Sequence, residues 1–250
     1  MTLNKAIFLN TLRYLMDAPV RLVIAGLLLL ILYAFVGGGV IMNEVPVAGV
    51  SGLVAGGNSL VVLLLWLLGL GLISRDISSG SLQLVLLRPL TRATYVLAKW
   101  AALAAVGVGV LLFVHLAFLA HHGLDSVDAQ TLALIFAAQC LQVAAVTAVI
   151  ALFSTVPINF GELGLLILCA VVFAVLKLLN LKYEVELLDQ ALSLAWRILL
   201  PKVAFSPGAD GTQDLLLSLG INAAVALAAL GGAMRLMWHR EFTYAEQAAG

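Results

Sequence analysis

The sequence predicts an all-α integral membrane protein. Of its 250 residues, 63% are hydrophobic and only 10% are charged. A soluble domain carries about 25% charged residues, so this chain could not cover its surface with polar groups. Backbone amides inside a membrane must be paired within the protein, and apolar runs of about 20 residues without alternation favour helices over a barrel. We therefore predict one transmembrane domain over residues 1–250.

Composition also excludes several classes of function. The formal net charge is zero, which argues against a nucleic-acid partner. Cys140 and Cys169 lie in apolar runs and are interpreted as small core residues rather than a disulfide or metal pair. His121 and His122 are adjacent instead of four residues apart, so no metal site is expected. No G-x-x-x-x-G-K-[ST] loop occurs, so the chain has no such cradle for nucleotide phosphates.

Residues 1–19 are predicted to form an N-terminal interfacial helix, although their apolar side chains do not form one clean stripe. Six transmembrane helices follow, and six crossings place both termini on the same side of the membrane. The spans are predicted at about 20–42, 53 or 59 to 73, 95–120, 130–153, 161–179 and 215–238.

Between the second and third spans, residues 73–99 form a polar interruption that holds five of the 26 charged residues (13 basic and 13 acidic). Gly80 breaks the chain before the apolar residues 81–87 and Pro89 stops them, so a short helix fits between. We interpret 74–94 as a cytoplasmic docking segment for a soluble partner. The alternative is an ordinary basic loop that obeys the positive-inside rule.

The distribution of Lys and Arg predicts the orientation. With the termini and the docking segment in the cytoplasm, nine basic residues lie inside and four outside, which is the bias of the positive-inside rule. The inner nine are Lys5, Arg13, Arg21, Arg75, Arg88, Arg92, Lys99, Arg235 and Arg240, and the outer four are Lys177, Lys182, Arg197 and Lys202.

The external segment 182–214 contains an amphipathic helix with a narrow polar stripe and a wide apolar face. Its charges make a crossing unfavourable, so we expect it to lie at the outer interface or to enter the bilayer and return. It serves either as a lid packed on the bundle or as a gate at the outer mouth. The polar stripe comprises Glu186, Asp189, Gln190, Ser193 and Arg197.

A few polar residues occur within spans. Gln139 and Gln142 share a helical face that should look into protein or a cavity. His115 is expected to make an interhelical hydrogen bond rather than to relay protons. No acidic residue lies deep in a span, which argues against a carrier driven by ions. The glycines in or beside the spans are expected to permit close helix packing: Gly26, Gly37–Gly39, Gly69, Gly71, Gly107, Gly109, Gly220, Gly231 and Gly232.

The docking segment resembles the membrane subunits of ABC-2 type transporters. That family's pattern is an Arg-acidic pair, a Gly three to four residues on, Thr-Leu-x-x-Leu-Leu, Pro-x-Ser-Arg and Gly-Lys. This chain departs from the pattern with Asp76 for Glu, Ser81 for Thr and Ala98 for Gly. The matching positions are Arg75, Asp76, Gly80, Ser81, Leu82, Leu86, Pro89, Thr91, Arg92 and Lys99.

The resemblance implies a permease subunit of an ATP-driven exporter in the bacterial plasma membrane, with both termini cytoplasmic. Its coupling helix would dock on a separate ABC ATPase subunit that binds ATP and magnesium, so the chain itself would be no enzyme. Other implied partners are a second copy or a homologous permease, the lipid bilayer and a protein on the outer side. The residues assigned to docking are Arg75, Asp76, Ser78, Gly80, Ser81, Leu82, Leu86, Arg88, Pro89 and Arg92.

Two other functions stay open. The chain could transmit force from ATP hydrolysis to an outer partner through 182–214 without transporting a substrate. Less expected is a secondary carrier or channel that acts alone.

Overall fold

The computed structural model describes the chain almost entirely as helices, and the described part contains no strand. The described residues are 4–16, 26, 50, 53–54, 60–80, 82, 91–122, 128–156, 169, 171–177, 186–204 and 211–239. The helices are α1 (Lys5–Met16), α4 (Val62–Gly69), α5 (Ser74–Ser78), α7 (Arg92–His122), α8 (Ala129–Thr155), α10 (Glu186–Leu199) and α11 (Gly211–His239). The predicted all-α class is confirmed for this part of the chain.

Three of the described helices are long and apolar enough to cross a membrane, namely Arg92–Ala120, Ala129–Thr155 and Gly211–His239. At about 1.5 Å per residue, each exceeds the roughly 30 Å thickness of a bilayer's hydrocarbon core. They coincide with the predicted third, fourth and sixth spans. The first span lies outside the described residues except at Gly26, and the fifth is described as helix only at 169 and 171–177. Six crossings therefore stay a prediction.

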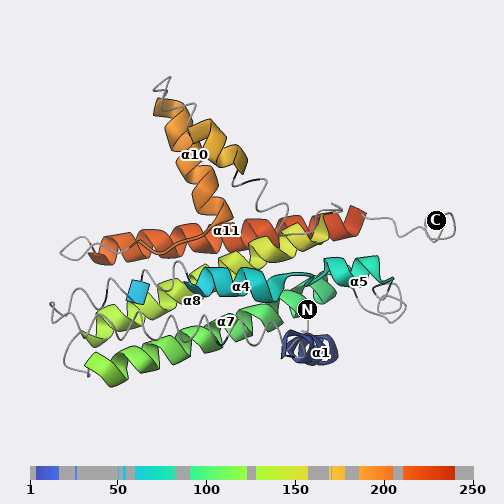
Figure 1. The fold of residues 1–250 in the computed structure, drawn as a ribbon, viewed down its shortest axis with the longest axis horizontal. Coiled ribbons are helices and arrows are strands. Elements are labelled where there is room, and N and C mark those ends of the chain that lie inside the picture. The colour runs from blue at the N-terminus through green and yellow to red at the C-terminus, as the bar shows by residue number, and fades with distance from the viewer. Residues whose placement is uncertain are drawn as a thin grey trace.

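The three long helices lie lengthwise beside one another, with α4 along the same bundle (Figure 1). α8 is the central member of the bundle, since 61% of its 18-residue apolar stretch is buried, against 39% of the corresponding stretch in α7 and in α11. Its sequence explains this position, because α8 contains neither an acidic nor a basic residue. The buried core follows from this arrangement: α4 and α7 pack on α8, and α11 packs most extensively against it.

Two glycines permit the close approach of α4, α7 and α8. A Cβ atom at Gly69 would lie 2.7 Å from Ile150 Cγ2, and one at Gly107 would lie 2.6 Å from Val143 Cγ1. No side chain fits at such distances without displacing its neighbour, so the predicted packing role is confirmed at these positions. A Cβ atom at Gly232 would lie 3.2 Å from Leu152 Cδ1, which is a tight but less severe contact.

The same prediction is wrong for other glycines. A Cβ atom at Gly26, Gly109, Gly220 or Gly231 would meet nothing within 4 Å, so these residues leave open faces in the single chain. Gly71 has a different role again, because its φ of +77° makes it a turn residue. Gly37–Gly39 lie outside the described residues.

The predicted N-terminal helix is found over Lys5–Met16, where it packs across α7 (Figure 1). Its packed stripe is Ile7, Thr11, Tyr14 and Leu15, a helical spacing that the apolar pattern hides because Thr11 is polar. The Thr11 hydroxyl is buried at little cost, since it donates to the Ile7 carbonyl at 2.8 Å. A location at the membrane interface stays a prediction.

α10 forms within the predicted external segment and projects away from α11, at an angle to the bundle (Figure 1). Trp196 of α10 stacks on Phe173 of the helical segment 171–177, with ring centroids 4.6 Å apart. The C-terminal end of α10 leads to Pro201, whose carbonyl accepts a 2.9 Å hydrogen bond from Gln142 on α8. The end of the segment therefore meets the bundle partway along α8, and its position relative to a membrane stays a prediction.

Candidate functional site

The candidate site is the turn that follows α4 on the way to α7, which we call the elbow and define as residues 70–80. Among the predicted docking residues, Ser81, Leu86, Arg88 and Pro89 lie outside the described residues. The predicted helix over 81–87 can be examined only at Leu82, which is helical and 1% exposed. The described part also contains a one-turn helix, α5, before Gly80, and the helix over 81–87 stays a prediction.

Two glycines shape the elbow. Gly71 and Gly80 have φ values of +77° and +70°, in the left-handed region that side chains disfavour, and they flank α5. The last turn of α5 is closed by hydrogen bonds to the Arg75 carbonyl from Ser78 Oγ at 3.1 Å and from Ser79 N at 2.9 Å. These turns set the direction in which the side chains of α5 point.

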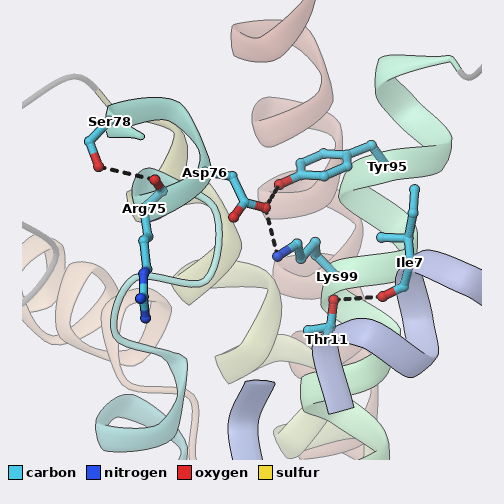
Figure 2. A network of polar contacts seen from close by, with 7 residues as sticks. All are labelled: Ile7, Thr11, Arg75, Asp76, Ser78, Tyr95 and Lys99. Atoms are coloured by element: carbon cyan, nitrogen blue, oxygen red, sulfur yellow. Dashed lines mark hydrogen bonds and ion pairs between the residues drawn. The ribbon is translucent and has the colours of Figure 1, made fainter. Parts of the chain in front are cut away.

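Asp76 points from α5 into a polar cluster on α7 (Figure 2). Lys99 Nζ lies 2.8 Å from Asp76 Oδ2, and the Tyr95 hydroxyl donates a hydrogen bond to the same oxygen. Tyr95 and Lys99 are four residues apart and thus share a face of α7. The side chain of Lys99 is 8% exposed and that of Asp76 is 26% exposed. This ion pair, buried on the lysine side and partly exposed on the aspartate side, joins the elbow to α7.

This geometry revises the interpretation of Asp76. The sequence assigned Asp76 to docking on a separate ATPase subunit, and the structure gives it partners on α7 of the same chain. The contact was missed although Lys99 belongs to the same polar stretch. The spacing of Tyr95 and Lys99 was an available signal, since a helix that starts at Arg92 places both on one face.

Arg75 points to the other side of α5. Its guanidinium carbon lies 5.0 Å from the centroid of the Tyr14 ring on α1, and the residue is exposed. The pKa of Arg75 is raised above its usual value, mainly by hydrogen bonding to the Tyr14 side chain and also by the Asp76 carboxylate. Arg75 therefore remains a cation at every physiological pH, and its exposure leaves it accessible to an acidic group.

Arg92 begins α7 and reaches the end of α11. Its Nη1 atom donates to the carbonyl oxygens of Met237 at 2.9 Å and Trp238 at 2.8 Å. The last carbonyls of a helix lack partners within the helix and carry partial negative charge, so a guanidinium stabilises them. Arg92 was assigned to ATPase docking, which stays a prediction. The structure adds a capping role that no local pattern indicates, because the partners lie about 145 residues away.

The predicted gate residues lie on α10, in a different part of the molecule from the elbow (Figure 1). Glu186 and Gln190 are exposed, and the side chain of Asp189 lies outside the described residues. Arg197 is partly buried, and its Nε atom has no hydrogen-bond partner in the described part. A gating or lid function of these residues stays a prediction.

Next to α10 the structure has a cavity of about 680 Å³, lined only by apolar residues of α8, α10 and α11. Its lining includes Val149, Phe153, Leu194, Ile198, Ile221 and Val225. The wide apolar face predicted for the external helix thus lies partly against this cavity.

The predicted inward face of α8 is confirmed. Gln139 and Gln142 are 0% and 2% exposed, and their amide nitrogens donate to the carbonyls of Leu53 at 3.2 Å and Pro201 at 2.9 Å. His115 was predicted to hydrogen-bond to another helix, and this is wrong for Nδ1, which lies 2.9 Å from the Leu111 carbonyl of its own helix. The contact of His115 with α8 is instead an edge-to-face packing on the Phe136 ring, with centroids 4.9 Å apart.

Within the described ranges, no three His, Cys, Asp or Glu residues lie together so as to hold a metal ion. The chain matches none of the protein families with which it was compared, and no curated protein sequence matches it. The chemistry that the described elbow offers is an exposed cation, Arg75, on a turn that is fixed to α7 and lies against α1.

Proposed function

We propose that this chain is the membrane-spanning permease subunit of an ABC-2 type ATP-driven exporter. The proposal rests on the resemblance of the 75–99 stretch and on one observation in particular, the Asp76–Lys99–Tyr95 cluster. A turn that merely connected two spans would need no ion pair to a span. A turn that receives mechanical work needs a stiff connection to a span, and this cluster supplies one.

In this proposal the ATPase subunit binds ATP and magnesium and contacts the exposed face of the elbow, where Arg75 and Ser78 lie. Displacement of the elbow is passed to α7 through Asp76 and Lys99. Since Arg92 joins the start of α7 to the last carbonyls of α11, the sixth predicted span moves with the third. A second copy or a homologous permease completes the path, and the two packings of the spans are discrete states rather than an elastic bend.

One observation favours a second candidate function, transmission of force to an outer partner without transport. α10 projects from the bundle (Figure 1) and exposes Glu186 and Gln190, and its Leu194 and Ile198, which line the cavity beside α8 and α11, are also 57% and 47% exposed. Such a surface is suited to contact another protein. A carrier driven by ions is less well supported, since the three candidate spans contain no acidic residue beyond Asp214 in the first turn of α11.

The test is a charge reversal at the elbow. Arg75→Glu combined with Gly80→Pro should abolish co-purification with the ATPase encoded nearest to this reading frame, and with it the ATP hydrolysis of the complex. Arg13→Glu is the matched control, because Arg13 is an exposed arginine on α1, the helix that Arg75 contacts. Unchanged binding and hydrolysis in the elbow variant would refute the docking assignment.

Reconstituted vesicles then separate the two candidate functions. ATP-dependent movement of a compound across the bilayer supports the exporter. ATP hydrolysis without movement of any offered compound, together with an outer protein held by α10, supports force transmission.

A further inference from the structure

A non-helical stretch of backbone lies against the middle of the bundle. Residues 201–204, which we call the connector, follow α10 and precede α11. Pro201 O accepts from Gln142 Nε2 at 2.9 Å, and Ala204 N donates to Ser218 Oγ at 2.9 Å. Gln142 lies about 20 Å along α8 at 1.5 Å per residue, near the midpoint of a helix long enough to span a membrane. Irregular backbone at that depth occurs where it is buried in protein or lines a water-filled cavity.

The side chains on either side of the connector are polar and buried. Gln142 is 2% exposed, and Ser218 and Asn222 are both 0% exposed. Ser218 and Asn222 are four residues apart, so they share the face of α11 that meets the connector. Both amide atoms of Asn222, Nδ2 and Oδ1, lack a hydrogen-bond partner in the described part of the chain. A fully buried amide without partners is unfavourable, which calls for a further state or ligand that satisfies it.

We propose that Gln142, Ser218 and Asn222 form a polar site at the middle of the bundle, and that the connector covers this site in the present state. The site takes water and uncharged hydrogen-bonding groups, such as hydroxyls and amides, because its own groups are amides and a hydroxyl. Ions are disfavoured at Gln142 and Asn222, since α8 carries no charged residue and Asp214 and Arg235 lie about two and more than three turns of α11 from Asn222. Its use as part of a transport path rests on the proposed function.

The connector is suited to leave the site. The hydrogen bonds that join the connector to Gln142 Nε2 and Ser218 Oγ are between neutral groups, which are the weaker kind. Withdrawal of the connector breaks the bonds at Gln142 Nε2 and Ser218 Oγ, and the Ser218 hydroxyl then lies one helical turn from the Asn222 amide on the same face of α11. α10 is joined directly to the connector, and its movement is the natural cause of withdrawal.

The test measures the access of a small neutral thiol reagent, 2-hydroxyethyl methanethiosulfonate, to Asn222→Cys in liposomes. The background carries Cys140→Ala and Cys169→Ala, which removes the two native thiols. Ala226→Cys is the matched control, one turn further along the same face of α11 and 7% exposed. Because the thiolate is the reacting form, a cysteine in a dry environment reacts slowly. Because the proposed site takes water whereas Ala226 lies among apolar side chains, we expect Asn222→Cys to react faster than Ala226→Cys although it is the more buried position.

Loosening the connector should increase access. Ser218→Ala removes the hydrogen bond with Ala204 N and, separately, Gln142→Leu removes the one with the Pro201 carbonyl, and each change should raise the reaction rate of Asn222→Cys at least about fivefold. Equal rates at the two cysteines, or rates that neither substitution changes, would overturn the proposal. The measurement uses the chain without an ATPase, so failure here does not bear on elbow docking, and failure of docking leaves this result standing.

Discussion

The Asp76–Lys99 ion pair gives the sharpest test of how the elbow is held. Asp76→Asn leaves the Lys99 ammonium without its anion, in a position where the side chain is 8% exposed. Removing one partner of a buried pair costs about 3–5 kcal/mol of the free energy of unfolding. We expect the lower end of this range, because the Asp76 side chain is 26% exposed and water still reaches the pair.

The opposite change is expected to cost less. Lys99→Met removes the ammonium, but the remaining carboxylate is the more exposed partner and keeps the hydrogen bond from the Tyr95 hydroxyl. Its cost should be about 1–3 kcal/mol. Tyr95→Phe deletes a hydrogen bond to a charged acceptor, for which about 1.5–3 kcal/mol is typical. Lys5→Met removes an exposed lysine on α1 and serves as a control that should change stability by less than about 0.5 kcal/mol.

The double variant Asp76→Asn/Lys99→Met decides whether the two residues act as a pair. Its cost should fall short of the sum of the single costs by about 1–3 kcal/mol, because the second substitution removes the ion that the first left unpaired. The free energies are measured by reversible unfolding in mixed detergent micelles. Additive costs within about 0.5 kcal/mol would mean that the side chains do not interact, and the elbow would lose its link to α7.

Three further predictions concern packing, capping and the buried amide. Gly107→Ala should destabilise the bundle by about 1–3 kcal/mol, because the new methyl group would lie 2.6 Å from Val143 of α8. Gly109→Ala is the control: its methyl group would enter open space, so the change should be neutral or stabilising. Arg92→Gln removes the guanidinium contact with the last carbonyls of α11, worth about 1–2 kcal/mol, and should therefore speed hydrogen exchange in the last turn of that helix. Arg235→Gln, at an exposed arginine of α11, is the control and should leave the exchange rate unchanged. Asn222→Leu should raise the free energy of unfolding by about 1–3 kcal/mol, since it removes an unsatisfied buried amide. In the proposed exporter the same variant should slow ATP-dependent transport. A destabilised variant would show that the amide has a partner.

The sequence predicted the long helices well because hydropathy is a local property. Runs of Leu, Ala and Val near 95–120, 130–153 and 215–238 exclude most alternatives to a helix in a membrane, and all three appear close to the predicted bounds. The inward face of α8 was predictable for a related reason. Two glutamines at i and i+3 in an apolar helix must point where their amides find partners, and Gln139 and Gln142 do so.

The contacts of the candidate site could not be predicted in the same way. Asp76 and Lys99 meet only because Gly71 and Gly80 turn the chain, and the direction of a turn is set by backbone angles that a sequence leaves open. Arg92 and the end of α11 are about 145 residues apart, so no spacing rule applies to them. Thr11 shows a third limit: a polar residue lies in the packed stripe of α1 because its own helix satisfies the hydroxyl, so a count of apolar residues misses the stripe.

The three contacts of this region differ in strength, and that difference predicts which elements move together. Asp76 on Lys99 is a protected ion pair, and Arg92 on the end of α11 is a charge-assisted cap, so α5, α7 and the last turn of α11 should move as one unit. Arg75 over Tyr14 is an exposed cation–π contact, which water and salt weaken. We therefore expect any displacement of the elbow to separate α5 from α1 before it separates α5 from α7. A cysteine pair that locks α1 to α5 should then block ATP-driven movement, whereas one that locks α5 to α7 should leave it intact.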